Sequence, residues 1–390
     1  MLMVSDDTLK HCLDVSTART IISTPDLAEF VPDNMQQFTL NFYSFSNTPS
    51  PEKKSASVVN LDHLPNPAVV PPPAKSTPKD ISVLIYTSGT TGKPKACTCR
   101  NMRMIITSTP LSQDVRNPKK YFPLRTYSPL PLFHGTALFT GLSYSIGTSS
   151  TFCLARKFSS SRFWKDVADS RATRHLYVGE LCRYLLAAPP SPYDRSHSCI
   201  VANGNGLRGE IWEKFRERFG IPEIREFYRS TEGIAKFDNF GVSKAGAGKL
   251  GFAGPIRRYM EEVTFIVKTD PLTEEVIRDP KTGFCVKADI EEAGEAIGKV
   301  RDRGLLEEYL NNHSATESKL LRDVFVKGDC YQRMGDLVVT ESSGWIRFHD
   351  RMGDTFRWKG ENVSAGEVRD HIGKLPGVQD AVVYGVKLIR

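Results

Sequence analysis

The sequence lacks the features that mark secreted and membrane-spanning proteins. No stretch of its 390 residues reaches the roughly 18 apolar residues that a transmembrane helix needs. The segment Met1–Lys10 has no apolar core of the signal-peptide kind, and the final residues Lys387–Arg390 are not the peroxisomal Ser-Lys-Leu ending. We therefore expect an intracellular protein. A peroxisomal or membrane-associated location stays open, and any membrane contact of this chain would be peripheral.

Closely spaced cysteines and blocks of like charge are also scarce. Of eight cysteines only Cys97 and Cys99 lie close together, so the spacing favours reduced buried thiols over a disulfide framework or a zinc site. The net charge of +7 arises from 52 basic and 45 acidic residues that are interspersed along the chain. This dispersion argues against a nucleic-acid-binding surface.

Strand-like and helical runs alternate along the chain. Apolar runs predict strands at Ile81–Tyr86 and Ile224–Tyr228, and another strand that ends in Pro129–His134. An amphipathic helix is predicted over Arg208–Phe219, with Gly220 as its cap. The alternation indicates an α/β architecture with mixed sheets.

The composition divides the chain into four expected segments. Residues 1–47 hold a helical run, Leu9–Leu13, and a strand-like run, Arg19–Ile22. Residues 48–80 are rich in proline, serine and lysine, which predicts a connecting arm without regular structure. We expect the core at 81–349 and, at 350–390, a hinge and a small α+β domain with a helix at Ala365–Lys374 and a strand at Ala381–Val386.

A Gly/Thr-rich segment directly follows the first predicted strand. It offers four hydroxyls, two glycines and a terminal lysine: Thr87, Ser88, Gly89, Thr90, Thr91, Gly92 and Lys95. The glycines allow backbone N–H groups to converge on an anion, and the lysine adds positive charge. Such a loop after a strand is typical of polyphosphate binding, although its spacing is not that of the nucleoside-triphosphatase loop. The alternative is a flexible surface turn.

The ten residues Tyr86–Lys95 resemble the signature of the adenylate-forming (AMP-binding) superfamily. Four other strings are similar to its fatty-acid-transport-protein and very-long-chain acyl-CoA synthetase branch, above all to fungal members: Leu176–Leu186, Asn203–Arg208, Phe219–Tyr228 and Gly353–Ser364. The resemblance extends from about Leu9 to Val386. It implies a large adenylate-forming domain of mixed sheets with helices, followed by a hinge and a truncated small C-terminal α+β domain.

Residue by residue, the resemblance implies an ATP site. Thr231 and Glu232 match the pair whose carboxylate holds Mg²⁺, and Tyr228 matches the aromatic that stacks on adenine. Asp336 matches the acid that binds the ribose hydroxyls, and Arg351 the hinge arginine that approaches ribose and phosphate. With Lys95, three of these (Thr231, Glu232 and Arg351) are the expected catalytic residues. The residues alone also allow other roles. Thr231 and Glu232 could start a helix, and Tyr228 could be a core residue. Asp336 could lie in a turn, and Arg351 could form a surface ion pair.

Three further residues are placed by the same resemblance. His134 matches a position near the carboxylate pocket, although a structural histidine is the alternative. Arg229 stands where the family usually has glycine beside the acyl tunnel. We expect it to narrow or polarise that path, or to be turned aside by an acidic partner. Arg357 aligns with a lysine that assists thioester formation in some relatives.

The resemblance thus implies an AMP-forming ligase that activates a long-chain fatty or related carboxylic acid. ATP, Mg²⁺ and CoA are the expected cofactors and co-substrates, in lipid or secondary metabolism. Alternatives are an impaired nucleotide- or acyl-binding remnant, an incomplete gene model of such a ligase, or a fatty-acid uptake protein. Because the family's late catalytic lysine has no counterpart before Arg390, we expect much-reduced adenylation by this chain alone.

Overall fold

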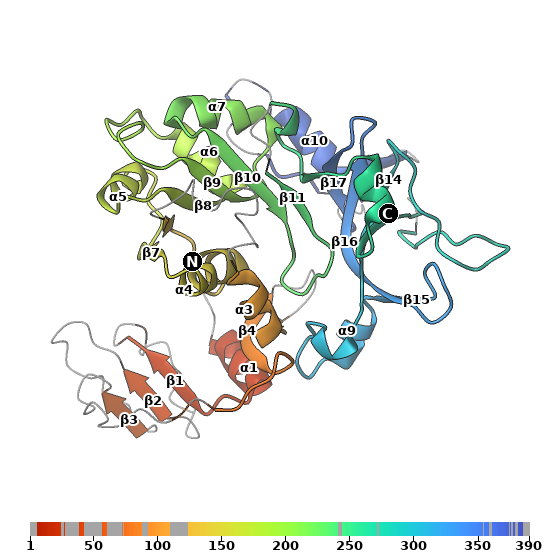
Figure 1. Ribbon diagram of the computed structural model, residues 1–390, viewed down its shortest axis with the longest axis horizontal. Helices are drawn as coiled ribbons and strands as arrows, with labels where there is room; N and C mark the ends of the chain where they lie inside the picture. Colours follow the sequence, from red (N-terminus) through yellow and green to blue (C-terminus); the bar gives the residue numbers. More distant parts are fainter. Residues whose placement is uncertain are drawn as a thin grey trace, which may run out of the picture. The chain divides into compact units, whose positions relative to one another are not determined.

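The computed structural model describes residues 6–24, 27, 39–42, 57–60, 72, 74–87, 93–109, 124–240, 244–270, 273–353, 355–358, 361–373, 375, 377–378 and 381–384. The chain forms two compact units (Figure 1). The first consists of Met1–Asn101 and Glu307–Thr316, and the second of Met102–Leu306 and Glu317–Arg390. The expected core segment 81–349 therefore contributes residues to both units.

The first unit contains a helix, a parallel sheet and a hairpin. Helix α1 spans Asp6–Ser16, as the helical run predicts. The sheet is formed by β1 (Thr20–Ser23), β2 (Thr39–Phe42) and β3 (Ser57–Asn60), and the antiparallel hairpin by β4 (Ile81–Thr87) and β5 (Lys95–Arg100). The predictions of strands at Arg19–Ile22 and Ile81–Tyr86 are confirmed.

The expectation of a structureless arm over 48–80 is wrong at β3. Two β-branched residues, Val58 and Val59, stand there without a proline, and the backbone of β3 pairs with β2 in parallel register. The prediction failed here because it used the amino-acid composition of the whole segment 48–80. Such an average does not reveal a strand of four residues.

In the second unit, a mixed six-stranded sheet has the strand order β11-β10-β9-β8-β6-β7. All its pairs are parallel except that of β10 with the edge strand β11. The bounds are β6 Arg125–Ser128, β7 Thr151–Leu154, β8 Arg174–Val178, β9 Val201–Asn205, β10 Glu223–Tyr228 and β11 Phe237–Asn239. The strand predicted at Ile224–Tyr228 is confirmed. Because the sheet is mostly parallel and is packed with helices, the predicted α/β class is confirmed as well.

The strand predicted to end in Pro129–His134 is wrong in its boundary. Strand β6 already ends at Ser128, and the following run forms a turn in which the His134 N–H donates to the Pro131 carbonyl over 3.1 Å. Pro129 and Pro131 have no N–H to donate to a neighbouring strand, so the strand cannot continue through them.

Helices α5 (Phe163–Asp169), α6 (Gly179–Ala187) and α7 (Gly209–Phe219) lie along this sheet (Figure 1). Their buried side chains, among them Phe163, Leu185 and Trp212, join the sheet residues in the largest apolar core of the described chain. Helix α7 confirms the predicted amphipathic helix. Gly220 follows it with a φ of 65°, the left-handed conformation in which glycine ends a helix without steric strain.

A second sheet of the same unit is antiparallel, with the order β12-β17-β16-β14-β13 and with β15 paired to β16. The bounds are β12 Gly251–Phe252, β13 Thr264–Lys268, β14 Ala293–Lys299, β15 Leu320–Arg322, β16 Cys330–Thr340 and β17 Trp345–Arg351. Its buried residues include Ala296, Val338 and Ile346, which pack with Tyr228 and Phe237 of the first sheet.

The remaining helices are short. They are α3 (Asn101–Thr107), η4 (Thr136–Ser143), α4 (Tyr144–Gly147), η5 (Lys244–Gly246), α8 (Pro255–Met260), η6 (Arg303–Leu305) and α9 (His313–Glu317). Within the described ranges, no helix is both long and apolar enough to cross a bilayer.

After β17 the chain forms the hairpin β18 (Thr355–Trp358) and β19 (Glu361–Ser364), followed by helix α10 (Ala365–Ile372). The helix confirms the prediction for 365–374. The strand predicted at Ala381–Val386 is wrong for 381–384, which form no strand, and Gly385 and Val386 lie outside the described residues. An apolar run alone does not make a strand, because each strand needs a partner for its backbone hydrogen bonds.

Candidate functional site

Several candidate residues follow the carboxyl ends of parallel strands in the second unit. His134 comes after β6, the Asn205-Gly206 turn begins at the last residue of β9, and the segment from Tyr228 to Glu232 begins at the last residue of β10. Because these strands run parallel, their carboxyl ends meet at one edge of the sheet, where α/β proteins commonly bind ligands. The Thr136 hydroxyl lies 3.3 Å from the Asn205 side-chain oxygen and links the first two of these segments.

A buried tyrosine and a buried aspartate meet across the two sheets of this unit. The hydroxyl of Tyr228 donates to Oδ2 of Asp336 over 2.5 Å, although 108 residues separate them in sequence. The other carboxylate oxygen, Oδ1, lies 3.5 Å from Nε of Arg351, whose side chain is largely exposed. The structure thus brings together three residues that the sequence predicted for one nucleotide site.

The register of the antiparallel sheet explains the Asp336–Arg351 pair. Strands β16 and β17 place these two residues opposite each other, with a register shift after Leu337. Gly335 precedes the aspartate with a φ of 74°, a conformation that other residues adopt only with strain. Its N–H donates to the buried carboxylate of Glu295 over 3.1 Å, which holds this irregular point of β16 in place.

The electrostatics of this group are set by burial. Desolvation raises the pKa of Asp336, whereas the Tyr228 hydroxyl and the Arg351 guanidinium favour its charged form and oppose that rise. Burial and the adjacent Asp336 charge both raise the pKa of Tyr228 above its ordinary value. The tyrosine ring also packs on Phe237, with 5.6 Å between ring centroids. Tyr228 is therefore a core residue whose polar end reaches Asp336.

Glu232 is engaged by a lysine that sequence analysis did not single out. Nζ of Lys319 lies 3.0 Å from Oε1 of Glu232, 87 residues away in sequence. The backbone carbonyl of the neighbouring Thr231 accepts a hydrogen bond from Arg103. In the part of the chain that the structure describes, no group of three or more acidic, cysteine or histidine side chains could hold a metal. A single carboxylate fits Mg²⁺ that takes its other ligands from phosphates and water.

In the first unit, the segment Thr87–Lys95, predicted to bind phosphate and called the phosphate loop below, starts and ends at one cross-strand pair. Thr87 closes β4 and Lys95 opens β5, and the two residues are partners in the hairpin. Ser88, Gly89, Thr90, Thr91 and Gly92 lie outside the described residues. The ammonium of Lys95 lies 5.2 Å from the ring centre of Tyr309, a cation–π distance.

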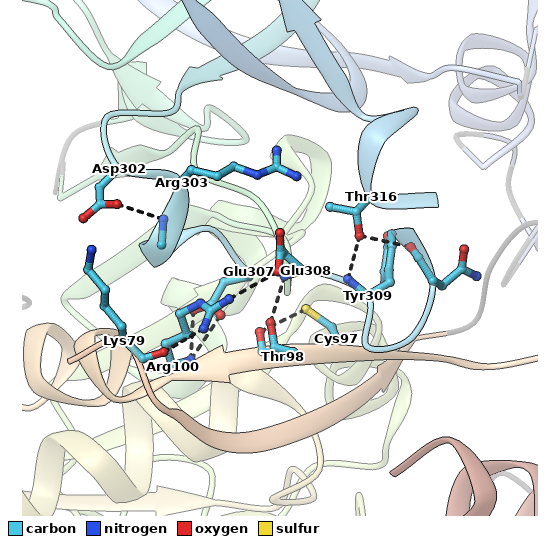
Figure 2. A network of polar contacts seen from close by, with 12 residues as sticks. Lys79, Cys97, Thr98, Arg100, Asp302, Arg303, Glu307, Glu308, Tyr309 and Thr316 are labelled. Carbon is cyan, nitrogen blue, oxygen red and sulfur yellow. Dashed lines mark hydrogen bonds and ion pairs between the residues drawn. The ribbon is translucent and has the colours of Figure 1, made fainter. Parts of the chain in front are cut away.

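Strand β5 is held by a segment more than 200 residues downstream, as Figure 2 shows. Thr98 and Glu308 exchange two hydrogen bonds of 2.8 Å, from the Thr98 N–H to the Glu308 carbonyl and from the Glu308 N–H to the Thr98 hydroxyl. The buried carboxylate of Glu307 accepts the Arg100 N–H at 3.1–3.2 Å. The segment Glu307–Thr316 therefore braces the strand that begins at Lys95.

His134 stands just before the π-helix η4, a rare helix type that is often found near functional sites. Its ring contacts that of Phe133, with centroids 4.7 Å apart, and partial burial lowers its pKa. At neutral pH the ring is therefore predominantly uncharged.

Arg229 is turned toward an acidic partner, the second of the two outcomes expected for it. Its guanidinium lies 2.7 Å from Oδ1 of Asp238 and donates to the carbonyls of Tyr228 and Phe237 over 2.7 and 3.0 Å. Arg357 belongs to β18, where its backbone pairs with Asn362, and its side chain lies outside the described residues.

Sequence reasoning also missed a buried carboxylate beneath the turn that follows β9. Glu226 accepts hydrogen bonds from the N–H groups of Gly206 and Leu207 and from the Tyr177 hydroxyl, the last over 2.5 Å. Burial raises its pKa to about 8, despite these hydrogen bonds. The positions of these residues in the sequence do not predict the contact, because the contact forms only when the strands β8, β9 and β10 lie side by side.

The family model described as "AMP-binding enzyme" matches residues 2–309 of this chain. The chain is 37% identical over 385 residues to "Long-chain fatty acid transport protein 2" of Rattus norvegicus, covering 97% of this chain and 60% of the relative. It is 36% identical to "Very long-chain fatty acid transport protein" of the fungus Cochliobolus heterostrophus, covering 97% of this chain and 58% of that relative. The chain thus spans about three fifths of these relatives.

Among solved structures, an anthranilate CoA ligase in complex with anthranoyl-AMP superposes with a TM-score of 0.75 at 16% identity. The match covers 99% of this chain and 69% of that chain. At this identity the similarity concerns the fold. It confirms the prediction of a large adenylate-forming-enzyme architecture, and the fatty acid transport relatives confirm the predicted branch, fungal members included.

Proposed function

Because the chain belongs to the AMP-binding enzyme family, we propose that it is, or is part of, an ATP-dependent acyl-CoA synthetase. Its acid would be a long-chain fatty or related carboxylic acid. The observation that carries this proposal is the Tyr228–Asp336–Arg351 group, in which the Asp336 carboxylate accepts the Tyr228 hydroxyl and stands beside an exposed guanidinium. Such a pair suits a ribose diol and the phosphate next to it.

The proposed roles are distributed as follows. Asp336 accepts hydrogen bonds from the ribose hydroxyls, Tyr228 packs near adenine, and Arg351 approaches the phosphate. The segment from Thr87 to Lys95 binds the ATP phosphates through hydroxyls, N–H groups and the lysine. Mg²⁺, when bound, neutralises phosphate charge and would be held by Glu232 with Thr231 beside it. His134 and Arg229 border the acyl group, and Arg357 assists the CoA step.

The reaction proceeds in two substitutions. The substrate carboxylate attacks the α-phosphate of ATP, which forms acyl-AMP and releases pyrophosphate. The CoA thiol then attacks the acyl carbon, forms the thioester, and releases AMP and a proton. The first step requires little covalent chemistry from the protein, so positioning and charge stabilisation by the loop, Lys95 and Arg351 are its main contributions.

A second candidate, fatty-acid uptake, is favoured by the names of the fatty acid transport relatives. Uptake is compatible with the same chemistry, because conversion to a charged thioester would retain the acid on one side of a membrane. Loss of uptake in a variant that still forms the thioester would separate the two functions.

The test is nucleotide binding by the 390-residue chain, measured by calorimetry with AMP. We expect Asp336→Asn to weaken binding by at least about tenfold, because hydrogen bonds to a charged group contribute about 1.5–3 kcal/mol. Asp289→Asn, at an exposed aspartate that pairs with Lys268, is the matched control. Absence of AMP binding, or equal binding by Asp336→Asn and wild type, would contradict the proposed nucleotide site.

Fatty-acid-dependent ATP–pyrophosphate exchange then separates a ligase from a binding remnant. Exchange by the wild-type chain that is lost in Asp336→Asn supports the ligase. AMP binding without any exchange supports the alternative that this chain binds nucleotide but does not adenylate.

A further inference from the structure

Helix α8 presents an apolar stripe that packing does not explain. Ile256, Tyr259 and Met260 are 77%, 92% and 70% exposed, and none of the six residues of the helix is buried. Their spacing, i, i+3 and i+4, places the three side chains on one face of the helix. Phe252, just before the helix, adds a fourth large apolar side chain that is 46% exposed.

Pro255 at the first helical position and the extended backbone of Glu261 limit α8 to this short length. The Glu261 carboxylate accepts the N–H groups of Val263 and Thr264 and so holds the turn that leads into β13. The chain on both sides of the helix is thus conformationally restrained, by Pro255 at its start and by the Glu261 hydrogen bonds at its end.

Positive charge accompanies the stripe. The Arg257 and Arg258 guanidinium groups each donate to a backbone carbonyl, of Phe252 and Ala253, both over 3.1 Å. Neither forms an ion pair with a carboxylate of the described residues. Together with Lys236 and Lys287 they line a cavity of about 140 Å³ next to the helix.

The acidic residues nearby are already engaged. Asp238 is paired with Arg229, Glu261 accepts two backbone N–H groups, and Glu262 is paired with Arg301. The surface around α8 therefore keeps a net positive charge, in a chain that carries +7 overall.

We propose that α8 docks on a lipid bilayer that contains anionic lipids. Ile256, Tyr259 and Met260 enter the headgroup region, while Arg257 and Arg258 contact lipid phosphates. Tyrosine suits this depth because its ring is apolar and its hydroxyl remains hydrated, and arginine reaches phosphate from a partly immersed helix. The inference does not depend on the proposed ligase activity.

A bilayer fits these side chains better than a protein partner. The three side chains of the stripe are 70–92% exposed, and both charged residues of the helix are basic. A membrane accepts such a surface without shape complementarity, and anionic lipids attract nearby basic residues by about 1 kcal/mol each.

The test is co-sedimentation of the full chain with phosphatidylcholine vesicles, with and without phosphatidylserine. We expect binding to the mixed vesicles, weaker binding to phosphatidylcholine alone, and a loss of affinity at high salt. Ile256→Ser/Tyr259→Ser/Met260→Ser should lower the partition constant at least about tenfold, through loss of buried apolar area. Arg257→Gln/Arg258→Gln should lower it roughly 25-fold, about fivefold for each charge.

Matched controls keep the result specific to α8. Ile146→Ser/Val326→Ser replaces two exposed apolar residues elsewhere, and Arg162→Gln/Arg322→Gln removes the same charge from other exposed sites. Thermal unfolding checks that every variant is folded. The proposal is wrong if the wild-type chain binds neither vesicle type, a result that would favour a protein partner for the stripe. It is also wrong if the α8 variants and the control variants lose the same amount of binding.

Discussion

At the scale of single residues, the contacts of Arg229 change the meaning of an unusual sequence position. The guanidinium is held by Asp238 and two backbone carbonyls, so its charge is largely compensated and its direction is defined. If this position borders the acyl group as proposed, the Arg229 side chain mainly restricts the room for that group. Its charge has less effect because Asp238 compensates it.

We therefore predict that Arg229→Gly shifts the preference toward longer acids, because the substitution removes a large side chain. The measurement is fatty-acid-dependent ATP–pyrophosphate exchange across a series of chain lengths. Asp238→Asn, which leaves the arginine and its two carbonyl partners in place, should keep the wild-type preference. An unchanged chain-length profile in Arg229→Gly would contradict this prediction.

Glu226 is the second residue whose surroundings matter. Its carboxylate is the acceptor for two backbone N–H groups of the turn after β9, and this turn carries Asn205 toward Thr136. We expect Glu226→Ala to destabilise the protein by about 2–3 kcal/mol, because buried donors lose their partner. Glu226→Gln should cost less than about 1 kcal/mol near neutral pH, since the wild-type carboxyl is mostly protonated there. Urea unfolding measures both, and equal losses would contradict this account.

At the scale of elements, a helix end in the second unit and a hairpin in the first unit determine where candidate site residues lie within each unit. Helix α7 ends at a left-handed Gly220, and the chain then turns directly into β10, the strand that leads to Tyr228. The hairpin β4–β5 sets the two ends of the phosphate loop, and the segment Glu307–Thr316 braces β5.

We predict that Gly220→Ala lowers the free energy of unfolding by about 1 kcal/mol, because alanine is strained at a φ of 65°. Gly220→Asn should cost less, since asparagine tolerates this conformation. Gly283→Ala, also at positive φ but in a surface turn with open space around it, reports the backbone strain alone. If Gly220→Ala is neutral in urea unfolding, the left-handed end of α7 is not required.

At the scale of the whole molecule, two buried groups make stability depend on pH in opposite directions. The pKa of Glu226 is about 8 in the folded chain, above its ordinary value of 4.5. Between these values the folded chain holds a proton that the unfolded chain has released, so stability falls as pH rises. Burial lowers the pKa of His175 from 6.5 to about 3, so between those values the unfolded chain binds the extra proton and stability rises with pH.

Variants can separate the two slopes. Relative to wild type, Glu226→Gln should gain stability steadily from about pH 4.5 to 8. His175→Leu should gain relative to wild type as pH falls from 6.5 toward 3, because leucine has no proton to acquire in the unfolded chain. Urea unfolding at a series of pH values gives these differences, and a pH-independent difference for either variant would contradict the corresponding assignment.

The family, the α/β class, the phosphate-loop motif and local elements such as α7 with its Gly220 cap could all be predicted from the sequence. These depend on spacing and backbone preferences within a few residues, and such signals survive without a fold. The contacts of Tyr228 with Asp336, of Lys319 with Glu232 and of Arg229 with Asp238 could not be predicted in this way, because they depend on the fold. Two of these contacts join residues 87 or more positions apart, so strand order and register, set by burial of the whole core, determine which side chains meet.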